Sequence, residues 1–168
     1  MIRPPDLPPQ LDTGARDGEA QPIDPEVEQR VRESFAKQGL MRHLGATMED
    51  VRRGEVRIRL PFRPELTQQH GFFHAGGTSA IADTAGGYAG LTVFPGGSAV
   101  LTVEFKINLV APAQGDALLA IGRVLKAGRT LTVCQLEVFA ERAGKLVNVA
   151  VGQQTLICLN EPGTRISA

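Results

Sequence analysis

Tryptophan is absent from this 168-residue chain, tyrosine occurs once, and aromatic residues make up only 5% of it. Basic and acidic side chains number 18 each, so no excess of positive charge is available to hold a nucleic-acid backbone. No apolar run approaches the ~18 residues that span a bilayer. The N-terminal segment contains prolines and acids where a signal peptide needs an apolar stretch. These absences predict a cytoplasmic protein that binds neither nucleic acid nor a membrane.

Residues that build disulfides or metal sites are also scarce. The two cysteines, Cys134 and Cys158, form no CxxC pair and lie in apolar, strand-like runs. This placement predicts buried thiols in a reducing compartment. His70 and His74 have no third ligand at a convincing spacing, so no metal site is predicted.

Composition divides the chain into three segments. Residues 1–24 are rich in proline, glycine and aspartate without periodicity, which predicts a flexible leader. Residues 25–162 are long enough for a single domain with its own hydrophobic core. Residues 163–168 are interpreted as a C-terminal tail.

Hydrophobic periodicity places the first elements of that domain. Asp24-Pro25-Glu26 is typical of a helix start, and the apolar spacing predicts an amphipathic helix to about Gln38, with Gly39 as its stop. Alternation from residue 44 to 62 predicts two strands, a short one over 44–51 and a longer one after a turn at Arg53-Gly54.

The segment from Gly76 to Thr92 consists mainly of alanine and glycine, and it predicts a helix that is apolar on all sides and therefore buried. Gly86 and Gly87 each cost about 1 kcal/mol of helix propensity, so tight packing must offset them. Four strands are predicted after this helix, over 99–110, 117–127, 130–142 and 146–159. One antiparallel sheet curled around the helix is the simplest arrangement that hides it.

The loop from Gln68 to Gly77 leads into the predicted central helix. A helix N-terminus exposes unpaired N–H groups and the positive end of the dipole. Such donors could stabilise the negative charge that develops on a thioester carbonyl oxygen in the transition state. Alternatively, the glycines of a tight loop serve its geometry alone.

Asp83 is the only acid between Glu65 and Glu104. Aspartate is rarely buried without a partner, which indicates a functional carboxylate unless Asp83 lies at the surface or makes a structural hydrogen bond to a neighbouring loop. Ala75 lies eight residues before it, a distance of ~12 Å along a helix. If both groups act on one thioester, they must therefore come from different chains, which predicts a homodimer with two shared sites.

These residues resemble those of a known family. Its loop pattern, Asn-x-x-Gly-x-x-His-Gly-Gly followed seven residues later by an aspartate, maps onto Gln68, Gly71, His74, Ala75, Gly76 and Asp83. Residues 66–159 thereby resemble the hotdog-fold acyl-CoA thioesterases, in the branch typified by the phenylacetate-pathway thioesterase. The resemblance implies an α+β fold, with an antiparallel sheet of five to six strands around a central helix and an additional N-terminal helix.

The resemblance also implies a role for each site residue. Asp83 would act as nucleophile or as general base toward water. The Ala75 N–H would polarise the thioester carbonyl, and Gly76 would allow its close approach. His74 would shape the loop or form a hydrogen bond near the thioester. Thr102 would help to position the water or the carboxylate.

Two loop positions depart from the family pattern. Gln68 is one methylene longer than the usual asparagine, so its contact is expected to be re-aimed or moved to Gln69. Ala75 replaces a glycine but keeps the N–H. Arg129, near a hairpin tip, is a candidate for contact with the phosphates of CoA. Alternatively, it is a solvated charge in the turn. No cofactor is expected, because coenzyme A is part of the substrate.

The leading hypothesis is hydrolysis of a short-chain, medium-chain or aromatic acyl-CoA. The alternatives are a non-catalytic hotdog module that binds acyl-CoA, and a hydratase or dehydratase, whose motif is not found in this sequence. The sequence leaves open the acyl group and the pairing of dimers into tetramers. Candidate pocket-lining residues, which could equally belong to the core, are Phe72, Phe73, Ile81 and Tyr88.

Overall fold

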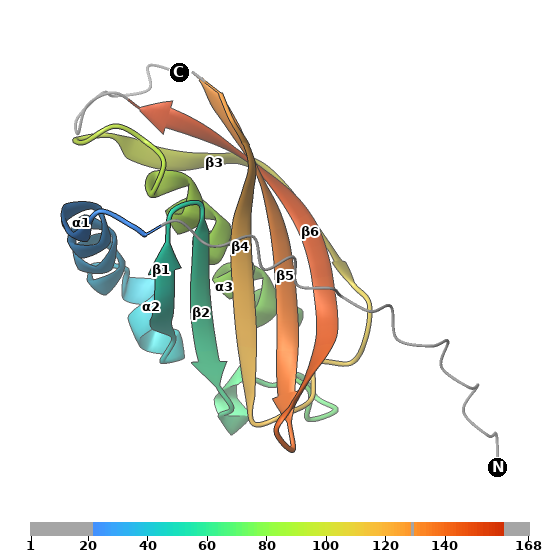
Figure 1. The fold of residues 1–168 in the computed structure, drawn as a ribbon. Helices are drawn as coiled ribbons and strands as arrows, with labels where there is room; N and C mark the ends of the chain where they lie inside the picture. Colours follow the sequence, from blue (N-terminus) through green and yellow to red (C-terminus); the bar gives the residue numbers. More distant parts are fainter. Residues whose placement is uncertain (1–21, 129, 160–168) are drawn as a thin grey trace, which may run out of the picture.

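In the computed structural model, which describes residues 22–128 and 130–159, a curved sheet wraps around one long helix (Figure 1). Residues 1–21 of the expected leader, the expected tail and Arg129 lie outside the described residues. The elements, in chain order, are α1 (Pro25–Ala36), α2 (Gly39–Leu44), β1 (Thr47–Arg52), β2 (Glu55–Pro61), the 3₁₀ helix η1 (Pro64–Leu66), α3 (Ala75–Leu91), β3 (Ala99–Leu109), β4 (Ala117–Ala127), β5 (Leu131–Arg142) and β6 (Lys145–Leu159).

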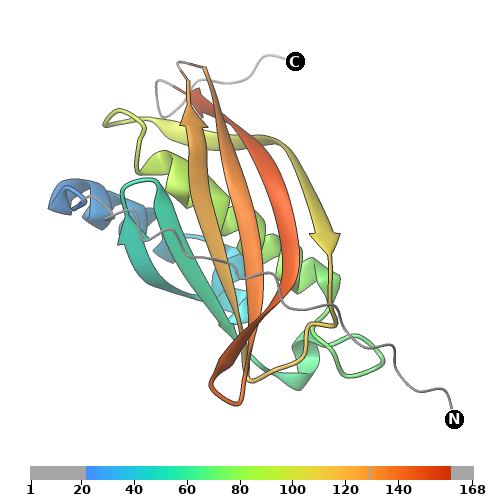
Figure 2. The same ribbon diagram turned by 45° about the vertical axis from the view of Figure 1, so that its right-hand side comes forward.

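The six strands form one antiparallel sheet in the order β1-β2-β4-β5-β6-β3. Strands joined by tight turns lie side by side, as their short connections predict. The longer link from residue 110 to 116 instead lets the chain cross over, so β4 pairs with β2 while β3 pairs with β6. Figure 2 shows β3 (yellow) at the opposite edge of the sheet from β1.

The N-terminal region starts as predicted and then differs. The Asp24 side chain accepts a hydrogen bond from the Glu26 N–H at 2.9 Å and caps α1. Gly39 does not stop this helix; α1 already ends at Ala36, and Gly39 begins the short helix α2. Because Gly45 ends α2 in the left-handed conformation (φ 75°), the strand expected from residue 44 begins only at Thr47.

The buried helix α3 packs directly against the backbone of the sheet. Eleven of its residues are buried, which confirms the interpretation of this segment as a buried helix. Gly122 of β4 faces it, and a Cβ at this position would overlap the backbone of Ala85 and Gly86. Small residues on both sides therefore bring helix and strand into closer contact than larger side chains would allow.

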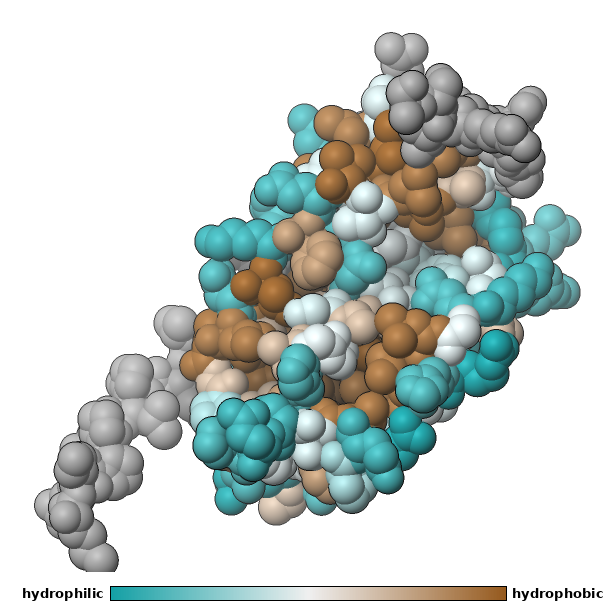
Figure 3. Space-filling view, turned by 180° about the vertical axis from the view of Figure 1, so that it is seen from behind, coloured by the Kyte–Doolittle hydropathy of each residue, from teal (hydrophilic) through white to brown (hydrophobic). Residues whose placement is uncertain are grey.

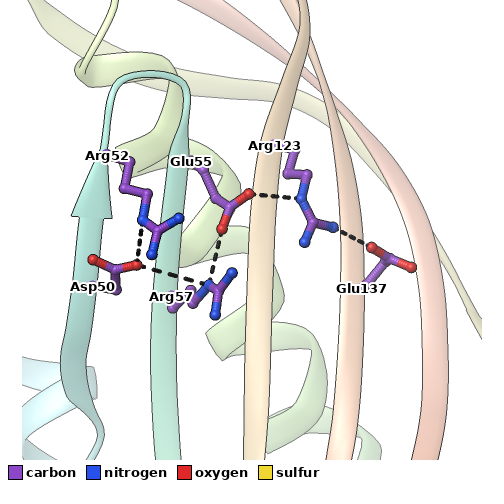
Figure 4. Close-up of polar contacts among 6 residues, drawn as sticks. All are labelled: Asp50, Arg52, Glu55, Arg57, Arg123 and Glu137. Atoms are coloured by element: carbon purple, nitrogen blue, oxygen red, sulfur yellow. Dashed lines mark hydrogen bonds and ion pairs between the residues drawn. The ribbon is translucent and has the colours of Figure 1, made fainter. Parts of the chain in front are cut away.

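Charged side chains cover the outer face of the sheet, away from α3. In Figure 4, Glu55 of β2 accepts from Arg57 at 2.9 Å and from Arg123 of β4 at 2.7 Å, and Arg123 also reaches Glu137. Burial alone would raise the pKa of Glu55, but hydrogen bonds from Arg57 and Arg123, together with their charges, outweigh it and lower the pKa below 4.5.

This lowered pKa predicts a pH dependence of stability. Because the folded pKa of Glu55 lies below its unfolded value, its stabilisation is present above the unfolded pKa and lost as pH falls through the folded pKa. Glu55→Gln is expected to lower the unfolding free energy at pH 7 by about 1 kcal/mol, since its partners are partly solvated. The difference in unfolding free energy from wild type should close as pH falls through the lowered pKa, as measured by urea unfolding at several acidic pH values. A difference in unfolding free energy that is the same at every pH would contradict this prediction. Glu49→Gln, at a more exposed position, is the control.

Candidate active site

The Asp83 carboxylate lies half-buried on α3, where β3 and β6 each present a hydrogen-bond donor to it. The Thr102 hydroxyl donates to Oδ1 of Asp83 at 2.8 Å, and Nε2 of Gln154 lies 2.5 Å from the same oxygen. The Gln154 amide also lies 3.1 Å from the Asp83 carbonyl oxygen and 3.0 Å from the Thr102 hydroxyl. Within residues 22–128 and 130–159, Oδ2 of Asp83 has no hydrogen-bond partner. One carboxylate oxygen is thus held and the other is open.

The N-terminus of α3 leaves one amide available. His74 caps the helix, and its Nδ1 accepts a hydrogen bond from the Gly76 N–H at 2.8 Å. The His74 carbonyl accepts from Gly77 at 3.0 Å and from Thr78 at 3.2 Å. The Ala75 N–H donates to no acceptor in the described part of the chain. Since Nδ1 accepts, the imidazole proton of neutral His74 lies on Nε2.

The loop before α3 is fixed by its own hydrogen bonds. The side-chain oxygen of Gln68 accepts from the His70 N–H, and its backbone N–H donates to the Phe72 carbonyl at 2.9 Å. The loop is anchored to the rest of the fold by Phe73, which donates to Ala113 at 2.9 Å, and by His74, which donates to Leu66 at 2.8 Å. Gln68 therefore closes the turn, and its carboxamide is directed at the loop itself.

These two groups of residues lie apart within one subunit. The structure brings Thr102 to Asp83, although the two are far apart in sequence. Ala75 and Asp83 belong to one continuous helix, α3, so eight residues, or ~12 Å, separate them. In a single chain the open amide and the open carboxylate oxygen cannot act on one carbonyl group.

A groove of about 500 Å³ begins at Asp83 and Thr102 and runs between α1, α3 and β3. Of the residues expected to line a pocket, Tyr88 lies here, and its hydroxyl is 3.2 Å from that of Ser34. Burial raises the pKa of Tyr88. Tyr88 also belongs to the hydrophobic core, as do Ile81 and Phe73, which do not line the groove. Phe73 packs edge-on against Phe62 with ring centroids 5.5 Å apart.

Sequence reasoning did not find Gln154. The segment over 146–159 was interpreted only as an apolar strand, yet Gln154 has the same parity as the buried Leu156 of β6. Because side chains alternate between the faces of a strand, a glutamine at an inward-facing position is an available signal of a buried polar contact.

Ligand-type residues do not gather elsewhere in the described ranges. Cys134 and Cys158 are thiols, and burial raises the pKa of Cys134 to about 12. In residues 22–128 and 130–159 there is no group of three His, Cys, Asp or Glu side chains that could hold a metal ion. No helix in the same ranges has the length and apolar character needed to cross a membrane.

A sheet wrapped around one buried helix in this way is the hotdog fold, and comparisons with known proteins agree. The thioesterase superfamily model matches residues 70–147. A thioesterase family protein from Silicibacter pomeroyi has a crystal structure with 43% sequence identity, covering 79% of this chain and 98% of that one, with a TM-score of 0.78. The chain therefore belongs to the thioesterase superfamily.

Two further comparisons differ in what they show. A Halobacterium salinarum protein, provisionally named an esterase, is 35% identical over 105 residues, which cover 60% of this chain and 69% of the relative. The PaaI protein from the phenylacetic acid degradation operon of Escherichia coli has 20% identity and a TM-score of 0.71, with 82% and 94% of the two chains covered. At that identity the likeness to PaaI is one of fold.

Proposed function

We propose that this protein hydrolyses an acyl-CoA thioester to a free carboxylic acid and CoA, with a short-chain, medium-chain or aromatic acyl group. The observation that carries the proposal is the Asp83 carboxylate, which has one oxygen held by Thr102 and Gln154 and the other open. In the reaction, the C–S bond breaks, water supplies the hydroxyl of the acid, and CoA leaves as a thiol. Asp83 acts either as nucleophile, forming an anhydride that water cleaves, or as general base toward water.

In this proposal the electrophilic half of the site comes from a second subunit. The Ala75 N–H at the positive end of α3 polarises the thioester carbonyl, with Gly76 beside it leaving room for the substrate. His74 holds the Gly76 amide, and Gln68 closes the preceding loop. Each Asp83 therefore works with the Ala75 amide of the partner in a homodimer with two shared sites.

The exposed face of the subunit supports this assembly. Strand β3 is an edge strand, and its side chains Leu101, Val103 and Phe105 are 42%, 58% and 41% exposed. Next to it, Ala75, Ala80 and Asp83 are only partly covered on α3. Figure 3, seen from the side opposite Figure 1, shows apolar side chains gathered in groups around a hollow. Apolar surface of this kind marks an interface.

The groove between α1, α3 and β3 is proposed to receive the acyl group because it begins at Asp83. Arg129, in the β4–β5 connection, is a candidate to bind the phosphates of CoA. No cofactor or metal takes part in the proposed reaction, since the developing charge is stabilised by a backbone amide.

The proposal is tested by thiol release from a panel of short-chain, long-chain and aromatic acyl-CoAs. We expect kcat/KM on the best substrate to reach at least about 10⁴ M⁻¹s⁻¹. Absence of turnover on every member would contradict the proposal. Calorimetric binding of acyl-CoA without turnover would instead identify a module that binds acyl-CoA but does not hydrolyse it.

A further inference from the structure

Gln154 is a buried polar side chain that contacts Asp83, and the proposed reaction gives it no role of its own. It lies on β6 and is 1% exposed. Its Oε1 is buried and has no hydrogen-bond partner within the described ranges. A buried carbonyl oxygen without a donor destabilises the folded state, because it has lost its water without gaining a partner. Some other contribution of this side chain must therefore offset the loss of stability.

The orientation of the amide is set by its neighbours. Nε2 faces three oxygens, which are the carbonyl oxygen of Asp83 at 3.1 Å, its Oδ1 at 2.5 Å and the Thr102 hydroxyl at 3.0 Å. A carbonyl oxygen and a carboxylate oxygen can only accept hydrogen bonds. A flipped amide would place Oε1 against both of them, so the nitrogen must face Asp83, and Oε1 is left without a partner.

Space for this arrangement is provided by a glycine on α3. A Cβ at Gly86 would overlap Oε1 of Gln154 and would lie 3.1 Å from the amide carbon of the same side chain. A glycine inside a helix is itself unfavourable for stability. The fold thus accepts both an unpartnered amide oxygen and a helix glycine in order to keep an N–H donor against Asp83.

We propose that Gln154 is a positioning residue for hydrolysis, an inference that rests on the function proposed above. A carboxylate with no fixed partner rotates, and neither oxygen is then held toward the substrate. Gln154 from β6 and Thr102 from β3 together bind Oδ1, so that Oδ2 is the oxygen that attacks the thioester carbon or removes a proton from water. Gln154 itself touches neither substrate nor reacting atoms.

A positioning role and a purely structural role predict different effects of replacing Gln154 on activity and on stability. If Gln154 served only the fold, its replacement by an apolar side chain of similar length would lower stability and leave the chemistry of folded molecules intact. If it positions Asp83, the same replacement removes the unpartnered oxygen, so stability stays level or rises, while turnover falls.

The test compares wild type with Gln154→Met and Gln154→Glu. Both variants are expected to lower kcat by about tenfold to a hundredfold, the effect of one hydrogen bond to a charged group, with KM changed less than about twofold. Gln154→Met should unfold at the same temperature as wild type or higher. Crystal structures of Gln154→Met and wild type should show the Asp83 carboxylate turned or disordered in the variant.

Gln153 provides the matched control, because it is the adjacent glutamine on β6 and its exposed side chain lies on the outer face of the sheet. The same two substitutions at Gln153 should leave kcat unchanged. An unchanged kcat in folded Gln154→Met, or an Asp83 carboxylate in its original position, would overturn the inference. The crystallographic comparison decides this even if wild type hydrolyses no thioester, an outcome that would contradict the proposed function alone.

Discussion

Asp83→Asn should lower kcat on the best acyl-CoA by about 10² to 10⁴-fold, the range that one acid–base group supplies. The amide retains a carbonyl oxygen that can accept from Thr102 and Gln154, so the variant should keep its fold and its unfolding temperature. Steady-state kinetics and thermal unfolding measure the two effects. Asp50→Asn, on the charged outer face, is the control for the same chemical change. Full activity in Asp83→Asn would contradict the assignment of the carboxylate.

The same variant tests the shared site when it is combined with Ala75→Pro. Proline at the first helical position is well tolerated, and the residue before it, His74, already has the extended conformation that proline requires (ψ 139°). This substitution therefore removes the N–H and keeps the helix. Ala75→Pro alone should lower kcat by about 10² to 10³-fold.

Equal mixing of the two variants should restore roughly a quarter of wild-type activity, because half of the dimers are mixed and one of their two sites is intact. Subunit exchange is verified by mass spectrometry. If exchange occurs and activity does not return, Asp83 and the Ala75 amide do not act across two subunits.

Gly122→Ala should produce a large loss of stability. The added methyl group would overlap the backbone of Ala85 and Gly86, which cannot move aside as a flexible side chain could. We expect the unfolding free energy to fall by about 1–3 kcal/mol or more. Chemical denaturation measures the change.

Gly87→Ala is the matched control for this prediction. A Cβ at this buried position of α3 would meet nothing within 4 Å, and alanine favours the helix. Its unfolding free energy should therefore rise, by about 0.5–1 kcal/mol. A Gly122→Ala variant that is as stable as wild type, or more stable, would show that close packing of α3 on β4 does not limit stability.

Local patterns in the sequence were sufficient to predict most of the fold. The alternation around Val56 and Ile58 predicted which side chains of β2 point inward, and both residues are fully buried. The short helices α2 and η1 were missed, because six or three residues carry too little periodicity to be recognised. The pairing of β3 with β6 was also beyond prediction, since strand order depends on where the long link crosses over.

The candidate site was predictable where it depends on helix geometry. The separation of Ala75 from Asp83 follows from eight residues of a continuous helix, and α3 has that continuity. The contacts of Asp83 were less accessible to sequence reasoning. Thr102 entered through family resemblance, while Gln154 was hidden in a strand interpreted by its hydrophobicity alone.

The composition of α3 also ties the site to the order in which the chain becomes structured. Five of its 17 residues are glycine, so the segment has little tendency to form a helix by itself and takes this shape only against the sheet. Its alanines and glycines lose almost no side-chain entropy when they are buried. Opening of the central strands would therefore dismantle the helix as well, and no partly unfolded form of this protein would retain both Asp83 and the Ala75 amide in place.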